Sequence, residues 1–181
     1  MTNDTDDTQL VEESLGGNER SFEILVRRYQ GPVFNAVLRI VRRHEDARDL
    51  TQSVFLKVYQ QLDTYDSRFK FYSWLYRIAI NESLNHLKRA GRYEPLEGDR
   101  PSSALDPEGA LAGVEIGRHV QEALMRLREE HRVVVVLRHF LDCSYEDIAQ
   151  AVGVPEKTVK SRLYSARQEL RELLQSRGVL P

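Results

Sequence analysis

Apolar residues recur every three or four positions along most of this 181-residue chain, and this spacing restricts the fold more than any other feature. Residues spaced in this way lie on one face of an α-helix. Stretches with the pattern run over 22–40, 47–62, 71–87, 116–127 and 159–174. No alternating apolar and polar stretch is long enough to predict a strand. The sequence therefore predicts an all-α protein.

Two places in this pattern need a separate interpretation. Gly31-Pro32 lies inside the first stretch, and proline lacks the backbone N–H that a helix interior requires, so we expect a kink or a short break there. The four consecutive valines within 129–140 favour a strand by propensity. Because no second strand is available to pair with them, we expect a helix.

A segment rich in glycine, proline and serine, residues 90–112, separates two helical parts. Such a composition is typical of a flexible linker. We therefore expect two small helical domains, each near the lower end of domain size. The expected divisions are an acidic N-terminal segment at 1–19, a first domain at 20–90, the linker at 91–115 and a second domain at 116–176.

Several classes of protein are disfavoured by what the chain lacks. The single cysteine, Cys143, excludes a disulfide within the chain, and no histidines stand with it at the spacing of a metal site. No nucleophile–base pair or glycine-rich phosphate loop is present, so we expect neither an enzyme nor a cofactor. The longest aliphatic run, 133–137, is too short to cross a bilayer, and the polar, acidic N-terminus is no signal peptide. We expect a cytoplasmic protein without membrane insertion.

Charge is distributed unevenly, although the net charge is only -2. Acids dominate residues 1–19, whereas bases outnumber acids in 67–92 and again in 153–181. Two separate basic segments indicate two local contacts with a polyanion such as DNA. Two solvated helix faces would give the same charges, so charge alone does not decide.

Residues 144–174 have the pattern of a helix-turn-helix. Ser144 and Asp147 can cap the first helix, Gly153 suits the left-handed turn, and Val159 can fill the angle between the helices. In this motif the second helix enters the DNA major groove by its N-terminal half. The alternative is a helical hairpin with a charged outer face. The predicted duplex-binding set is Lys157, Thr158, Lys160, Ser161, Arg162, Tyr164, Ser165 and Arg167.

Aromatic and basic residues interleave between Tyr65 and Arg77. Such mixtures bind single-stranded nucleic acid, because bases stack on the rings while cations hold the backbone. Phe71 and Trp74 also fit a hydrophobic core, whereas Tyr72 and Tyr76 need not be buried. The predicted single-strand set is Tyr65, Arg68, Lys70, Phe71, Tyr72, Trp74, Tyr76, Arg77 and Asn81.

These pieces, in this order, resemble the bacterial RNA polymerase sigma factors of the extracytoplasmic-function group. Three motifs carry the resemblance: Asp46-Ala47-x-Asp49-Leu50-x-Gln52-x-x-Phe55, then Trp74-Leu75-Tyr76-Arg77-Ile78-Ala79-x-Asn81, and Ser144-Tyr145-Glu146-Asp147-Ile148-Ala149 followed by Thr158-Val159-Lys160-Ser161-Arg162-Leu163. Residues 22–89 look like sigma domain two and residues 119–174 look like sigma domain four. A short linker in place of the domain between them points to the extracytoplasmic-function group.

The resemblance implies a role for each surface. Asp49, Gln52 and Phe55, with Ser53 and Leu56 beside them, fall where the family docks on the clamp helices of the polymerase beta-prime subunit. The loop from Asp63 to Phe71 falls where the family captures an unstacked base of the minus-ten element, in the melted non-template strand. The helix from Tyr72 to Arg89 falls where the family holds the upstream edge of that element. The duplex-binding set falls where it reads the minus-thirty-five element, and the helix around 133–140 would help to hold the flap of the beta subunit.

The resemblance also implies an anti-sigma factor as a partner, and it leaves some points open. Ser53 stands where the family usually has glutamate, so the docking contact is expected to be altered. The acidic segment 1–19 has no assigned role. The main alternative is a helix-turn-helix regulator that binds duplex DNA by itself, and a second is a helical anti-sigma or adaptor protein.

Overall fold

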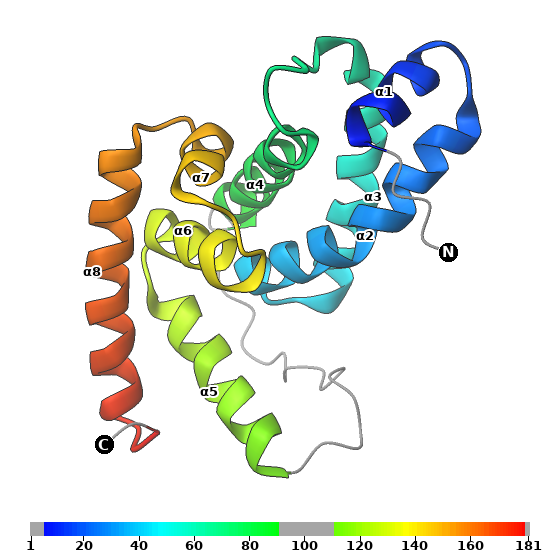
Figure 1. Cartoon of the computed structure of the whole chain (residues 1–181). Helices are drawn as coiled ribbons and strands as arrows, with labels where there is room; N and C mark the ends of the chain where they lie inside the picture. Colours follow the sequence, from blue (N-terminus) through cyan, green and yellow to red (C-terminus); the bar gives the residue numbers. More distant parts are fainter. Residues whose placement is uncertain (1–5, 91–110, 180–181) are drawn as a thin grey trace.

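The structure is a computed structural model that describes residues 6–90 and 111–179. Every regular element in these two ranges is a helix, which confirms the predicted all-α class (Figure 1). The first range forms α1 (Asp7–Leu15), α2 (Glu19–Val41), α3 (His44–Gln60), the short 3-10 helix η1 (Leu62–Thr64) and α4 (Phe71–Ala90). The second forms α5 (Leu111–Arg126), α6 (Glu129–Phe140), α7 (Tyr145–Val152) and α8 (Glu156–Gln175).

Helix α2 is continuous through Pro32, so the break predicted as one outcome at Gly31-Pro32 is wrong. A proline in a helix interior costs roughly 3 kcal/mol. Here the turns after the proline are held by buried Val33, Val37 and Ile40, whose packing offsets that cost. The predicted helix over the valine run is confirmed as α6. Its valines are buried, which explains why a segment of high strand propensity is stable as a helix.

Two expected boundaries need correction. Residues 91–110 of the expected linker lie outside the described residues, but α5 already begins at Leu111, so residues 111–115 belong to a helix. The acidic segment 1–19 contains α1, which packs on α2 and buries Leu10 and Val11. The first domain therefore includes this helix and begins before residue 20.

The two domains pack against each other in this structure (Figure 1). Helix α4 lies along α7, and α2 contacts both α5 and α6. The Arg132 guanidinium on α6 donates a hydrogen bond of 2.9 Å to the Ile40 carbonyl at the end of α2. The Arg39 guanidinium lies 3.7 Å from the centre of the Phe140 ring. The buried apolar residues of the two halves thus form one hydrophobic core, and these polar contacts join the halves at its edge.

Candidate nucleic-acid and protein interfaces

The local structure of the helix-turn-helix follows from its sequence. Ser144 Oγ accepts a hydrogen bond of 3.1 Å from the Asp147 N–H, and the Ser144 N–H donates one of 2.9 Å to Asp147 Oδ2. This reciprocal pair satisfies amide groups that the first turn of α7 leaves without helical partners, as predicted. Gly153 has a φ of 69°, in the left-handed region that favours glycine. Pro155 precedes α8 directly, as its N-cap residue.

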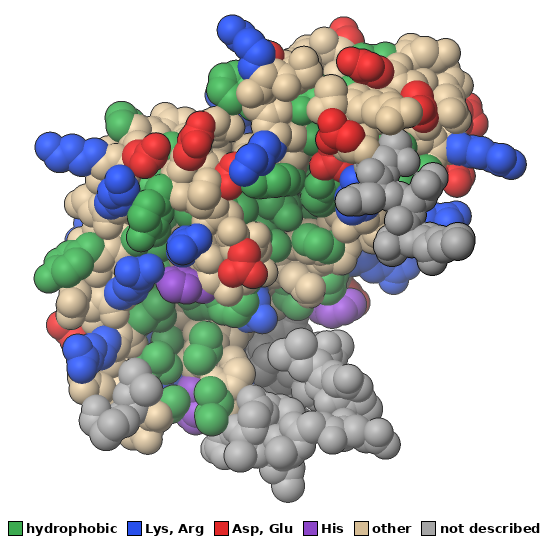
Figure 2. All heavy atoms as spheres, viewed as in Figure 1, with side chains coloured by type: hydrophobic (Ala, Val, Ile, Leu, Met, Phe, Trp, Pro, Cys, Tyr) green, Lys and Arg blue, Asp and Glu red, His purple; other side chains and the backbone are tan. Residues whose placement is uncertain are grey.

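Helix α8 buries one stripe and exposes the residues predicted to meet duplex DNA. Val159, Leu163 and Ala166 are buried against the rest of the domain. The opposite face carries Tyr164, which is 67% exposed. Figure 2 shows Lys and Arg side chains along the outer side of this helix, at the left edge of the view. Of the other predicted residues, Lys157, Lys160, Ser161 and Arg167 are exposed, and Thr158, Arg162 and Ser165 are half-buried.

Two of these basic side chains have acidic neighbours. Arg162 Nη2 lies 2.8 Å from Glu130 Oε2 on α6, and Lys160 Nζ lies 3.3 Å from Glu156 Oε2 one turn earlier. The Lys160–Glu156 pair is exposed and the Arg162–Glu130 pair is partly exposed, and ion pairs in contact with water contribute little to stability. Both side chains can therefore exchange a carboxylate for a phosphate at small cost.

The segment between α3 and α4 forms an exposed loop that is supported by packed aromatic side chains. The rings of Tyr65, Phe71 and Trp74 lie with their centroids 5.6 to 5.9 Å apart, an arrangement we call the aromatic cluster. The Tyr65 hydroxyl donates a hydrogen bond of 2.6 Å to the Phe69 carbonyl, which closes the loop. The Phe69 side chain itself is exposed, and sequence reasoning missed it. Its position between Arg68 and Lys70 in a loop was the available signal.

The rest of the single-strand set divides into exposed and buried members. Arg77 and Asn81 are exposed one turn apart on α4, and Tyr72 is half-buried. Tyr76 is only 6% exposed, and Phe71 is buried as well. The expectation that Tyr76 need not be buried is therefore wrong in this arrangement, because α7 packs along α4. Burial raises the pKa of the Tyr76 phenol, and Cys143 in the second domain raises it further.

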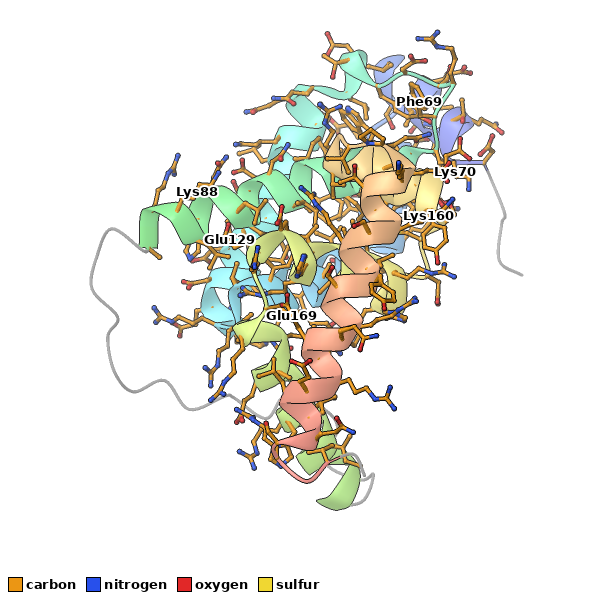
Figure 3. All side chains as sticks on the ribbon, turned by 90° about the vertical axis from the view of Figure 1, so that its left-hand side faces the viewer. Phe69, Lys70, Lys88, Glu129, Lys160 and Glu169 are labelled. Atoms are coloured by element: carbon orange, nitrogen blue, oxygen red, sulfur yellow. The ribbon has the colours of Figure 1, made fainter. Side chains whose placement is uncertain are left out.

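The start of α4 contacts the helix-turn-helix directly through Asp147. Lys70 Nζ lies 3.3 Å from Asp147 Oδ1, and Ser73 Oγ donates a hydrogen bond of 3.4 Å to the same oxygen. Burial raises the pKa of Asp147, but hydrogen bonds from Ser144, Tyr72 and Lys70 outweigh it and lower the pKa below its usual value. Figure 3 shows Phe69 and Lys70 at one end of α4, on the side of Lys160, and Lys88 at the other end. Part of the predicted single-strand surface thus faces the second domain.

Helix α3 exposes a row suited to docking on a protein. Asp49 and Gln52 are exposed, Ser53 is half-buried, and Leu56 is 59% exposed. Phe55 is 8% exposed and packs into the core, so it does not belong to the exposed docking face. Tyr59, exposed one turn after Leu56, was missed although its spacing from Gln52 and Leu56 places it on the same face. An exposed leucine and tyrosine flanked by polar groups are typical of a protein contact.

The valines of α6 are not on the surface. Val133, Val134, Val135, Val136 and Leu137 are all buried, and α6 packs on α2 and α8. The helix expected to hold a partner subunit therefore turns these side chains inward in this arrangement. Separately, none of the described helices combines the length and apolar character that a membrane span requires.

Comparison with known families places the two helical parts in one group of proteins. Residues 25–93 match the family model described as Sigma-70 region 2, and residues 118–170 match that of Sigma-70, region 4. The chain is similar to the RNA polymerase sigma-H factor of Pseudomonas aeruginosa, with 36% identity over 97% of both chains. It is also similar to the ECF RNA polymerase sigma-E factor of Haemophilus influenzae, with 33% identity over 97% of this chain and 98% of the relative.

Two solved structures resemble the whole arrangement. One is CnrH in complex with the cytosolic domain of CnrY, with a TM-score of 0.74 and 26% identity over 94% of this chain and 97% of that one. The other is the sigma factor RpoE in complex with the anti-sigma factor NepR from Bartonella quintana, with a TM-score of 0.72 and 26% identity over 86% of this chain and 98% of that one. The likeness covers both helical domains and not one of them alone.

Proposed function

Because the chain belongs to the extracytoplasmic-function group of RNA polymerase sigma factors, we propose that three of its surfaces divide the work of promoter recognition. It binds core polymerase and directs initiation at specific promoters, which is the function of this family. The exposed row on α3 docks on the beta-prime clamp helices. The loop before α4 and the exposed side of α4 take the minus-ten element, and α8 takes the minus-thirty-five element.

The exposed face of α8 is the observation that carries the DNA-reading part of this proposal. Its N-terminal half presents Lys157, Ser161 and Tyr164, with the buried stripe behind it fixing their direction. Lysine can donate to guanine edges in the major groove, and serine can contact either kind of base. Arg167, further along, is placed for the phosphate backbone, which positions the helix without reading sequence.

At the minus-ten element the loop captures an unstacked base of the melted non-template strand. Exposed Phe69 offers a ring on which a base can stack, and Arg68 and Lys70 beside it offer charge to the backbone. Capture of a flipped base offsets part of the cost of unstacking it. Arg77 and Asn81 on α4 extend this surface along the strand.

The packed arrangement of the two domains fits a free or inhibited protein. Lys70 is paired with Asp147, and α7 covers part of α4, so the domains must separate before both promoter elements are bound. Polymerase then holds them at a set spacing, which raises the effective concentration of the second contact without new interactions. The similarity to the sigma factor RpoE in complex with the anti-sigma factor NepR supports an anti-sigma factor for this chain too. The protein acts in the cytoplasm, and it contributes binding surfaces and no reacting group.

Replacing Lys157 by alanine tests the role of α8. On a promoter fragment bound by the holoenzyme, Lys157→Ala is expected to weaken minus-thirty-five binding. As the loss of a contact with a base edge, the change should cost about 1 to 3 kcal/mol and relax the preference at one base pair of the element. Arg171→Ala is the control, because Arg171 is exposed on the same helix but roughly 20 Å further along it, at 1.5 Å per residue. Equal effects of the two changes in fluorescence anisotropy titrations would contradict the assignment.

A further inference from the structure

Helix α1 has no part in the three surfaces above, yet it is firmly packed. It lies against α2 and against η1, which begins the segment leading to the minus-ten loop (Figure 1). Leu10 and Val11 are buried in this contact. Its acids, which were noted in the sequence without a role, are therefore held at a fixed place beside the DNA-binding loop.

Asp7 is the acid that connects α1 to the rest of the domain. Its carboxylate forms an ion pair with the Arg28 guanidinium and accepts a hydrogen bond from the Tyr29 hydroxyl. The Asp7 side chain is 17% exposed, so this is a largely desolvated contact. Hydrogen bonds to a charged group that is shielded from water are stronger than neutral ones.

The contact continues from Tyr29 to the minus-ten loop through aromatic rings. The Tyr29 ring lies 5.6 Å from that of Phe71, between centroids, and Phe71 belongs to the aromatic cluster with Tyr65 and Trp74. Tyr65 in turn holds the Phe69 carbonyl through its hydroxyl. One chain of direct contacts thus runs from Asp7 to the tip of the loop.

The electrostatics of the two tyrosines agree with this geometry. Burial raises the pKa of the Tyr29 phenol, and its hydrogen bond to Asp7 raises it further. Burial also raises the pKa of the Tyr65 phenol, with the Asp7 and Asp6 carboxylates adding to the effect and a hydrogen bond with Thr8 opposing it. The start of α1 is therefore close both to Tyr65 of the aromatic cluster and to Tyr29, which contacts Phe71 of that cluster.

We propose that Asp7 is a positioning residue for minus-ten recognition: through Tyr29 it fixes the aromatic cluster that holds the base-capturing loop in its binding conformation. The inference rests on the proposed function of that loop. It gives α1 a role that does not require α1 to touch DNA. Since the negative charge of Asp7 is balanced by Arg28, Asp7 itself adds little repulsion of the strand next to the loop.

Asp7→Asn tests this, because it keeps the size of the side chain and removes the charge. The chain has a single tryptophan, Trp74, which lies in the aromatic cluster and reports on it by fluorescence. In Asp7→Asn we expect Trp74 emission of the free protein to move to longer wavelength. The holoenzyme should bind a single-stranded minus-ten oligonucleotide on the order of tenfold more weakly, while its affinity for core polymerase is unchanged.

Glu12→Gln is the matched control. Glu12 is exposed on the same helix but on a different face from Asp7, so the same charge change there should alter neither Trp74 emission nor oligonucleotide binding. Tyr29→Phe is a second variant, which keeps the ring against Phe71 but removes the hydroxyl that donates to Asp7. As in Asp7→Asn, Trp74 emission should move to longer wavelength and binding of the minus-ten oligonucleotide should weaken. Unstacking of a 2-aminopurine in the non-template strand of the promoter should fall in both variants.

The outcomes separate this inference from the proposed function. Wild-type Trp74 emission and wild-type base unstacking in Asp7→Asn would overturn the positioning role while leaving the sigma function intact. An equal loss of core affinity and oligonucleotide binding would also overturn it, since that pattern indicates general disruption of the domain. Failure of the wild-type holoenzyme to open any promoter would instead contradict the proposed function, and this inference with it.

Discussion

Leu56→Arg is expected to lower the affinity of the protein for core RNA polymerase by about 30-fold or more, the loss that marks the few dominant residues of an interface. Leu56 is 59% exposed at the centre of the row that also carries Gln52 and Tyr59. If this row is buried on the polymerase, an arginine there must lose its water without gaining a partner. The side chain is outside the core of the free protein, so the free energy of unfolding should change by no more than about 0.5 kcal/mol.

A titration of labelled protein with core enzyme measures this effect. Leu15→Arg is the control, because Leu15 is similarly exposed at the end of α1 and the substitution is identical. Its affinity for core should equal that of the wild type. If Leu56→Arg and the wild type bound core equally well, the docking surface would lie elsewhere on the molecule.

Arg132→Met is expected to lower the free energy of unfolding by roughly 3 kcal/mol, since several buried carbonyl groups lose their donor at once. The Arg132 side chain is buried, and burial lowers the pKa of its guanidinium. It donates to the carbonyls of Leu124, Met125 and Leu127 at the end of α5, at 2.9 to 3.1 Å, and to that of Ile40 near the end of α2. One cation therefore caps two helix C-termini, where the macrodipole favours positive charge.

Urea unfolding followed by circular dichroism tests this prediction. Methionine keeps the side chain up to about the Nε position and removes the guanidinium, so the change reports the lost hydrogen bonds together with the space that the guanidinium filled. Arg128→Met is the control, because Arg128 is exposed just before α6 and makes no side-chain capping bond. Its effect should stay within about 0.5 kcal/mol. Equal stabilities for the two variants would mean that water replaces the guanidinium at these carbonyls.

The helices and the helix-turn-helix could be predicted because their signals are local. The cap of Ser144 with Asp147 and the turn at Gly153 depend only on neighbouring residues, and both occur as expected. The presence of α1 was missed, although Leu10 and Val11 among the acids and the pair Gly16-Gly17 after them are signals of a short helix.

Other features depend on contacts between distant parts of the chain and were beyond a reading of the sequence. Periodicity indicates which face of a helix is apolar, but not which helix covers it, so the burial of Tyr76 beside the second domain was unexpected. Phe55 belongs to the docking motif, and docking was predicted for it, but in the folded domain its side chain packs into the core. The role of Arg132 needs the ends of two helices that are far apart in sequence.

Transcription from a promoter library with purified core polymerase, with and without this protein, tests the central claim most directly. We predict transcripts only when the protein is present, starting at sites that share two elements at a fixed spacing. Variants of the duplex-binding set should alter selection at the minus-thirty-five element, and variants of the single-strand set should alter selection at the minus-ten element. If no transcript depended on the protein while the protein alone bound one duplex site tightly, it would be a regulator acting without sigma function, and the account would be contradicted.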